Sequence, residues 1–405
     1  MTVEVNDFIA AIYADAWSRI VGVMIRFTGG DWDLAEECAQ DAFAQALQKW
    51  SESGVPRQPV AWLTTAARNR AIDRMRRRSN ALAKLQELAA LDVETPSYVT
   101  DSEIPDERLE LMFTCCHPSL SLEAQVALTL RSLAGMSTLE IARAFLVSER
   151  TMGQRLFRAK QKVQHARIPY RVPPMHLLPE RLPAVLNVLY LLFNQGYGDP
   201  HQTRLCQEAI RLARVLTELM PDEPEAQGML ALMLLHGARR QSRFDADFNL
   251  VGLEEQDRSR WNTDDVAEGT AILERALRQG RAGPFQIQAA IAACHAIAPS
   301  TAETDWREIV GLYEQLARVA PSSVVDLNRA VAIAMVDGPE AALPLIDAIA
   351  RSGALNEYYL LHATRADLLR RAGRTSEASD SFRAALALAP TDAERNFLSR
   401  RLQGG

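Results

Sequence analysis

One stretch, residues 121–164, constrains the fold more than any other, because it fixes several helix boundaries within a short span. Gly135 follows an apolar helical pattern and predicts the end of a helix. Ser137 and Glu140 have the S-x-x-E spacing of a capping box, which predicts the start of a short second helix. Ser148 can cap a longer third helix that reaches about residue 164. Two helices joined by so tight a turn predict a helix-turn-helix.

The last of these helices is basic, and its two faces differ in chemistry. Ile141, Val147, Met152 and Leu156 predict the core beneath the turn. Gly153 lies inside the helix, where glycine costs about 1 kcal/mol relative to alanine, so it either permits close approach to DNA or only weakens the helix. The polar face has the side-chain types that read base edges in a major groove, namely Arg150, Thr151, Gln154, Arg155 and Arg158.

A second basic segment lies upstream. Six arginines fall between residues 68 and 78, with Asp73 as the only acid among them. They end a helix that Pro59 opens, and a separate helix with an acidic first turn, residues 33–50, precedes it. A run of charge is most often only a solvated helix end. Two such segments on one chain favour binding to nucleic acid.

The rest of the chain has a different sequence pattern. Residues 79–105 are rich in Ser, Thr, Asp and Pro near their end and predict a linker. Residues 172–405 are helical, and small and aromatic residues between 369 and 390 have the spacing of a tetratricopeptide unit. Partial matches to the same spacing recur at irregular intervals earlier in the segment, which predicts a degenerate array of helical repeats. Lys and Arg balance Asp and Glu over residues 1–171, with 21 of each, whereas residues 172–405 carry 24 and 30.

Composition excludes several classes of protein. Apolar residues make up 48% and aromatic residues 6%, so we expect an all-α chain of several domains. No apolar run is long enough to span a membrane and no secretory signal is visible, so we expect the cytoplasm. Cys115-Cys116-His117 has no second ligand pair nearby, and we expect neither metal nor cofactor. Without a phosphate loop, a nucleophile elbow or an HExxH motif, we expect no enzyme.

Several of these stretches together resemble a known family. DWDLAEECAQDAFAQALQKW followed by PVAWLTTAARNRAIDRMRRR is similar to region 2 of an extracytoplasmic-function (ECF) sigma factor, of the sigma-70 family. The helix-turn-helix followed by FRAKQKV is similar to region 4. FTCCHPSL, RIPYRVP and LYLLFNQGYGDP, with the long helical C-terminus, resemble the ECF subgroup that has a tetratricopeptide extension. The boundaries are then 7–78 for region 2, 79–105 for the linker, 106–168 for region 4 and 172–405 for the extension.

The resemblance implies partners and contacts. The acidic helix is expected to dock on the β′ clamp of core RNA polymerase through Asp33, Glu36, Glu37, Gln40 and Asp41. The arginine helix is expected to bind and melt the −10 promoter element, with DNA contacts from Asn69, Arg70, Arg74, Arg76, Arg77 and Arg78. The helix-turn-helix is expected to bind the −35 element while region 4 sits on the β flap.

The extension and the whole-chain function leave alternatives open. The extension is either a stabilising appendage or a regulatory module that binds a peptide or the rest of this chain in a groove. We favour regulation, and the resemblance implies that such an extension takes the place of a separate anti-sigma factor; the sequence leaves open whether this chain has one. Two other functions compete with a sigma factor: a duplex-binding helix-turn-helix regulator, and a tetratricopeptide scaffold, neither of which engages polymerase. The acidic helix placed before the arginine helix favours the sigma factor, because a simple repressor has no use for that pair.

Overall fold

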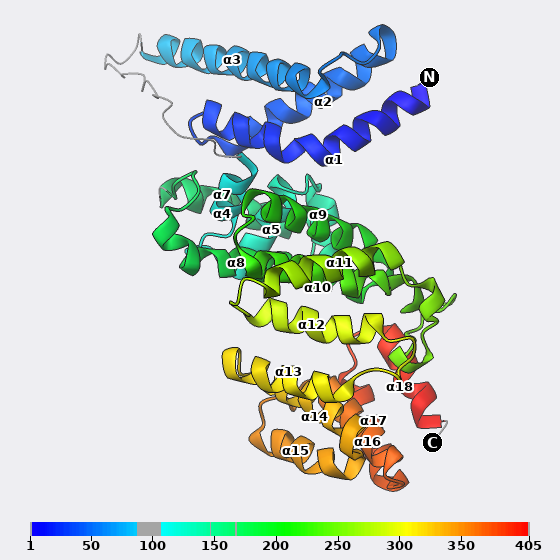
Figure 1. Ribbon diagram of the computed structural model, residues 1–405. Helices are drawn as coiled ribbons and strands as arrows, with labels where there is room; N and C mark the ends of the chain where they lie inside the picture. Colours follow the sequence, from blue (N-terminus) through cyan, green and yellow to red (C-terminus); the bar gives the residue numbers. More distant parts are fainter. Residues whose placement is uncertain (1, 87–106, 146, 167, 404–405) are drawn as a thin grey trace. The chain divides into compact units, whose positions relative to one another are not determined.

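The chain is all-α, as predicted. The computed structural model describes residues 2–86, 107–145, 147–166 and 168–403, and their regular structure is helical apart from one isolated bridge between Phe244 and Leu250. The chain divides into two compact units, Met1–Leu192 and Phe193–Gly405 (Figure 1).

The N-terminal unit is built from α1 to α7 and the start of α8. Its helices begin where the sequence supplies caps: Asp31 accepts a hydrogen bond from the Leu34 amide at 3.0 Å, and Pro59 opens α3. The α3 helix continues past the predicted boundary at residue 78, and residues 87–105 of the predicted linker lie outside the described residues. The bounds are α1 (Thr2–Phe27), α2 (Trp32–Ser53), α3 (Pro59–Gln86), α4 (Glu107–Cys115), α5 (Leu122–Ser132), α6 (Thr138–Ala144), α7 (Glu149–His165), η1 (Met175–Leu177) and α8 (Leu178–Gly198).

An aromatic core ties the first helices of this unit to the turn after α5. Trp17, Trp32 and Trp50 are buried, and Tyr13 stacks on Trp17 with 4.9 Å between ring centroids. Gly135 has φ +66°, and a Cβ atom there would lie 2.8 Å from the Tyr13 ring. The Tyr13 hydroxyl donates to the Gly135 carbonyl at 3.1 Å. Gly135 therefore allows both the turn and the close packing of α1 on it.

The C-terminal unit is a succession of paired helices. In Figure 1, α12 to α17 lie one after another, and α10 packs against α11 and α12. The bounds are η2 (Pro200–Gln202), α9 (Thr203–Leu219), α10 (Pro224–Ala238), η3 (Arg240–Ser242), η4 (Leu253–Glu255), η5 (Arg258–Arg260), α11 (Thr263–Leu277), α12 (Pro284–Ile297), α13 (Trp306–Val319), α14 (Ser323–Asp337), α15 (Pro339–Ser352), α16 (Tyr359–Arg371), α17 (Thr375–Leu388) and α18 (Asp392–Gln403).

The α16–α17 pair contains the predicted repeat unit. Leu369, Ala378, Phe382 and Ala385 are buried, as their spacing requires. Gly373 has φ +77° between the two helices. Small residues let the helices approach, and the Phe382 ring fills the space beside them. The spacing therefore predicted the contacts of this pair.

The long segment between α10 and α11 is held by the last helix of the chain. Arg401 on α18 donates to Glu255 at 2.7 Å, and Arg400 donates to the Leu250 carbonyl at 2.9 Å. The segment bends back on itself near Asp245, whose carboxylate accepts from the Asn249 amide at 2.8 Å. These bonds fix a stretch that the sequence pattern left without periodicity.

Candidate nucleic-acid and protein interfaces

The helix-turn-helix forms from its caps. The Ser137 amide donates to the Glu140 carboxylate at 2.7 Å and the Glu140 amide donates to Ser137 Oγ at 3.2 Å, so both halves of the capping box are present. The Thr151 amide donates to Ser148 Oγ at 3.1 Å and starts α7. Ile141 and Met152 are fully buried beneath the turn. The second helix therefore has a fixed orientation on the first.

The predicted base-reading residues lie on α7, and most of them are open to a ligand. Arg150, Thr151, Gln154 and Arg158 are exposed. Arg155 is partly buried, with its guanidinium 5.7 Å from the centre of the Phe145 ring. Beside them, a Cβ atom at Gly153 would find Thr138 Cγ2 at 4.0 Å, so packing within the chain does not require glycine there.

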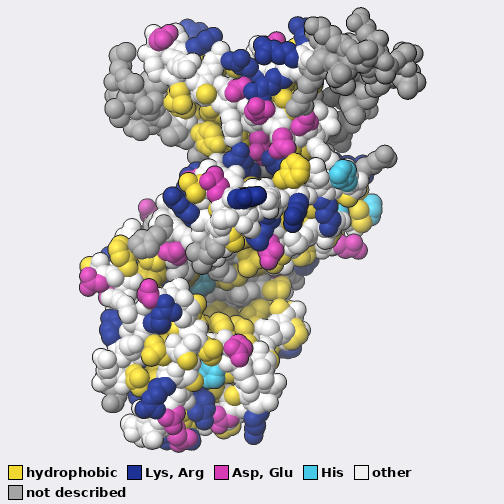
Figure 2. Space-filling view, turned by 180° about the vertical axis from the view of Figure 1, so that it is seen from behind, with side chains coloured by type: hydrophobic (Ala, Val, Ile, Leu, Met, Phe, Trp, Pro, Cys, Tyr) yellow, Lys and Arg dark blue, Asp and Glu magenta, His cyan; other side chains and the backbone are white. Residues whose placement is uncertain are grey.

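The arginines of α3 are divided between exposed and paired side chains. Asn69, Arg70, Arg76 and Arg77 are exposed. Arg78 lies on the helix, but its side chain is outside the described residues. Figure 2 shows Lys and Arg side chains beside Asp and Glu over α1–α3, so this surface is not uniformly basic.

Arg74 is one of the basic side chains that lie beside acids on this surface. Its guanidinium forms an ion pair with Glu37 and donates to Asp41 Oδ2 at 3.0 Å, and both acids belong to α2. Arg74, a predicted DNA contact, is therefore paired within the chain with Glu37 and Asp41, two predicted polymerase contacts. Gln40, between them on the helix, is exposed.

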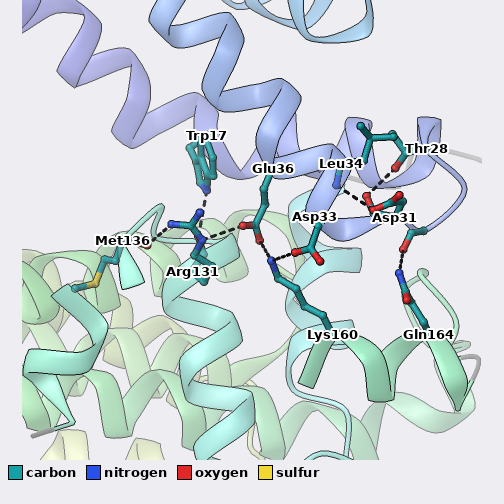
Figure 3. A network of polar contacts seen from close by, with 11 residues as sticks. Trp17, Thr28, Asp31, Asp33, Leu34, Glu36, Arg131, Met136, Lys160 and Gln164 are labelled. Atoms are coloured by element: carbon teal, nitrogen blue, oxygen red, sulfur yellow. Dashed lines mark hydrogen bonds and ion pairs between the residues drawn. The ribbon is translucent and has the colours of Figure 1, made fainter. Parts of the chain in front are cut away.

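The other half of the acidic face of α2 meets α5 and α7 (Figure 3). Arg131 Nε donates to Glu36 Oε2 at 2.9 Å. Lys160 Nζ donates to Asp33 at 2.8 Å and lies 3.1 Å from Glu36 Oε1, an ion-pair contact without hydrogen-bond geometry. Glu36 is 3% exposed and Lys160 is 8% exposed, whereas the Asp33 side chain is mostly in solvent. Glu36 is therefore a buried acid with two cationic partners.

Two further hydrogen bonds join α1 and the turn after it to α5 and α7. Trp17 Nε1 donates to the Arg131 carbonyl at 3.3 Å, and Gln164 donates to the Gly30 carbonyl at 3.1 Å. The two bonds connect α1 to α5, and the turn between α1 and α2 to α7. An open cleft of about 330 Å³ remains beside the ion pairs, and Glu37 and Gln40 line it opposite Phe157 of α7. The predicted polymerase-binding face of α2 is thus partly covered by the helix-turn-helix half of the unit.

Sequence reasoning missed Arg131 and did not separate Lys160 from the other basic residues. A signal for Lys160 is present in the sequence. Met152, Leu156 and Val163 mark the apolar face of α7, and Lys160 follows Leu156 by four residues on that same face. A lysine on a buried face needs a partner, and the partner acid lies on a helix far away in sequence.

The Cys115-Cys116-His117 fragment is part of the packing. Both thiols are buried, and burial raises the pKa of Cys116 to about 12. The His117 ring accepts a hydrogen bond from the Ser119 amide at 3.1 Å. Over the described part of the chain, no three His, Cys, Asp or Glu side chains gather as a metal site. No helix within the same residues is long and apolar enough to cross a membrane.

Comparison with known families assigns both halves of the N-terminal unit. The model of sigma-70 region 2 matches residues 13–81, and that of sigma-70 region 4 matches residues 110–163. A family of unknown function (DUF6596) matches residues 181–277. The N-terminal unit is thus of the sigma-70 type, with regions 2 and 4 in the order that the sequence predicted.

Individual relatives define the family more narrowly. The ECF RNA polymerase sigma factor SigK of Mycobacterium sp. (strain KMS) is 31% identical over 156 residues, which are 37% of this chain and 78% of the relative. The uncharacterized protein R00370 of Rhizobium meliloti (strain 1021) is 42% identical over 394 residues, 95% of this chain and 92% of the relative. The chain belongs to the ECF sigma factors and carries a C-terminal helical extension.

Proposed function

We propose that the chain binds core RNA polymerase and directs it to initiate transcription at specific promoters. The observation that carries this proposal is the joint presence of regions 2 and 4 with an exposed basic face on α7. In this role Asn69, Arg70, Arg76 and Arg77 contact the −10 element. The exposed face of α7 reads the −35 element. The chain contributes binding and DNA melting, not catalysis, and the role would place it in the cytoplasm.

The polymerase contacts follow from α2. Asp33, Glu36, Glu37, Gln40 and Asp41 supply a carboxylate-rich surface for the β′ clamp, and region 4 supplies the contact with the β flap. Because Arg131 and Lys160 already occupy Glu36 and Asp33, we further propose that region 4 leaves α2 before the clamp binds. The described arrangement is then a closed state with lower affinity for polymerase.

Run-off transcription tests the proposal directly. The purified full-length chain is added to core enzyme with genomic promoter fragments, including the region upstream of its own gene. A promoter-specific transcript is expected, and its loss with the double variant Arg150→Ala/Gln154→Ala at unchanged folding would assign it to α7. Co-purification with core enzyme separates a sigma factor from a repressor or a scaffold. A folded chain that neither co-purifies nor initiates would overturn the proposal.

The C-terminal helices are proposed to regulate this activity. Truncation after Gly198 keeps the whole of α8, part of which belongs to the N-terminal unit. If the extension regulates, specific activity in the run-off assay changes at matched protein concentration. If the extension only stabilises, abundance in cells falls while specific activity stays the same, and the regulatory part of the proposal is refuted.

A further inference from the structure

Two stretches that the sigma regions do not explain meet in the C-terminal unit. One is LYLLFNQGYGDP at the end of α8, and the other is the segment QSRFDADFNLVGLEEQDRSRW between α10 and α11. Arg240 donates to the carbonyls of Gly196 and Asp199 at 3.3 and 3.2 Å, which fixes the start of the segment on the end of α8. The Arg243 guanidinium lies 4.4 Å from the centre of the Tyr197 ring.

Other basic and imidazole side chains surround the same ring. The Arg239 guanidinium is 5.9 Å from the Tyr197 centroid, and the His236 ring centroid is 5.7 Å from it. His295, at the end of α12, is close enough to His236 to lower its pKa when His295 is charged. We call these five residues, Tyr197, His236, Arg239, Arg243 and His295, the Tyr197 cluster. They come from α8, from the end of α10 and the segment after it, and from α12, which the chain brings together only by folding (Figure 1).

The charge of the cluster is not compensated by an acid. Among the described residues, no carboxylate lies within ion-pair distance of Arg239 or Arg243. Acids of neighbouring elements have other partners. Glu394 accepts from the Tyr359 hydroxyl at 2.8 Å, and Asp245 accepts from Asn249 and pairs with Arg400. A neighbouring cation, Arg258, is held separately, because it donates to the His295 and Ala298 carbonyls at 2.5 and 2.6 Å.

The cluster also contains buried polar atoms without a partner. Tyr197 is 9% exposed, and its hydroxyl has no hydrogen bond to any described residue. Arg243 Nε and His295 Nδ1 are buried and have no hydrogen bond within the described part of the chain either. Buried polar atoms are almost always satisfied in folded proteins, and the Tyr197 hydroxyl and Arg243 Nε both carry donor hydrogens, so these two groups indicate a missing acceptor.

Burial and the neighbouring arginines both lower the pKa values of the two histidines. Burial, followed by the charges of Arg239 and Arg243, holds the pKa of His236 well below its usual value. Burial, followed by Arg239 and Arg258, lowers the pKa of His295 to about 4. Both imidazoles are therefore neutral near neutral pH, and the charge of the cluster comes from its two guanidinium groups.

We propose that the Tyr197 cluster binds a phosphate group, with Arg239 and Arg243 as its counter-charges and the Tyr197 hydroxyl as a donor. A phosphate group carries about −1.5 to −2 charges at neutral pH, which matches two guanidinium groups better than a single carboxylate does. Guanidinium groups are also suited to bidentate contacts with phosphate oxygens. The phosphate is either free inorganic phosphate or part of a small organic phosphate. Its binding does not depend on the proposed sigma function.

Calorimetric titration of the full-length chain tests the site with two probes, inorganic phosphate and adenosine monophosphate, at ionic strength matched with chloride. Binding of either probe is expected, and the better one distinguishes the two sources. Arg239→Gln and Arg243→Gln should weaken binding about tenfold or more, as loss of a charge-assisted hydrogen bond implies. Tyr197→Phe keeps the ring under Arg243 and should weaken binding by a smaller factor.

The matched control is Arg278→Gln, which removes an arginine whose side chain is 70% exposed and forms an ion pair with Glu274 at 4.0 Å. It should bind the probes as the unmodified chain does. Circular dichroism keeps loss of binding apart from loss of folding, and Tyr197→Phe remains informative if the arginine variants unfold. NMR titration of labelled histidine should show a higher His295 pKa with phosphate bound. Binding of neither probe, equal binding by all variants, or an unchanged His295 pKa would overturn the proposal.

Discussion

Replacing Lys160 with methionine should open the closed arrangement of regions 2 and 4. Methionine keeps the apolar stem of the side chain and removes the ammonium group. The contact with Asp33 contributes little, because the Asp33 side chain is 67% exposed. The contact with Glu36 matters more, because both side chains are buried. Breaking a buried ion pair so that one charge is left uncompensated costs about 3–5 kcal/mol, and the cost here is smaller, about 1.5–3 kcal/mol, because Arg131 still pairs with Glu36.

That cost shifts the equilibrium between closed and open states by roughly 10- to 150-fold. If the closed state dominates and excludes the clamp, the apparent Kd for core polymerase falls by about the same factor. Fluorescence anisotropy of the labelled full-length chain with core enzyme measures this change. Hydrogen exchange at the start of α2 reports opening independently. Glu36→Gln should open the chain further, by about 3–5 kcal/mol, because it leaves both cations without their buried acid.

Lys162→Met is the matched control, because Lys162 is exposed on the same helix. It should change neither hydrogen exchange nor polymerase binding. The reasoning fails in two ways that the assays distinguish. If Lys160→Met exchanges like the control, the ion pair does not hold the closed state. If it exchanges faster but binds polymerase no better, the covered face of α2 is not what limits binding.

Four further outcomes are expected. Gln154→Ala should weaken −35-dependent initiation by about 1–3 kcal/mol at one promoter position, whereas equal loss on every promoter variant would mean that the residue reads no base. Arg76→Ala should weaken binding to all promoters and make the logarithmic salt slope shallower by about 1; a change confined to one sequence would contradict a phosphate contact. Gly153→Ala should stabilise the chain to urea by up to about 1 kcal/mol, and lose −35 binding only if the backbone approaches DNA there. Because the pKa of His295 is lowered to about 4, the unfolded chain takes up this proton first as pH falls. Stability to urea should therefore drop between about pH 6.5 and pH 4, by at most about 3 kcal/mol, and less in His295→Gln.

Local sequence signals predicted the helices well. Gly135, Ser137 and Ser148 act through neighbours a few residues away, and the structure places them at the predicted helix ends. The exposed face of α7 could also be predicted from the sequence, because the periodicity of apolar residues gives the exposed face once the helix is assigned.

The burial of Glu36 on the acidic helix α2 could not be predicted from such local signals. Glu36 has the surroundings of an exposed residue in the sequence, and its burial depends on Arg131, which lies 95 residues away. The meeting of Tyr197 with Arg243 also depends on tertiary structure, because the segment after α10 has no periodicity that would place it on α8. Sequence patterns give the faces of helices, whereas pairing between faces requires the fold.

The position of Arg74 has a consequence for how the two proposed ligands of this chain, promoter DNA and polymerase, affect each other's binding. The same guanidinium neutralises Glu37 and Asp41 and belongs to the basic run of α3. If DNA phosphates draw Arg74 away, the two carboxylates on α2 are released and attract a basic partner more strongly. A basic partner that takes those carboxylates releases Arg74 for DNA to the same extent. Thermodynamic reciprocity then requires promoter and polymerase to strengthen each other's binding by one common factor, through a single side chain.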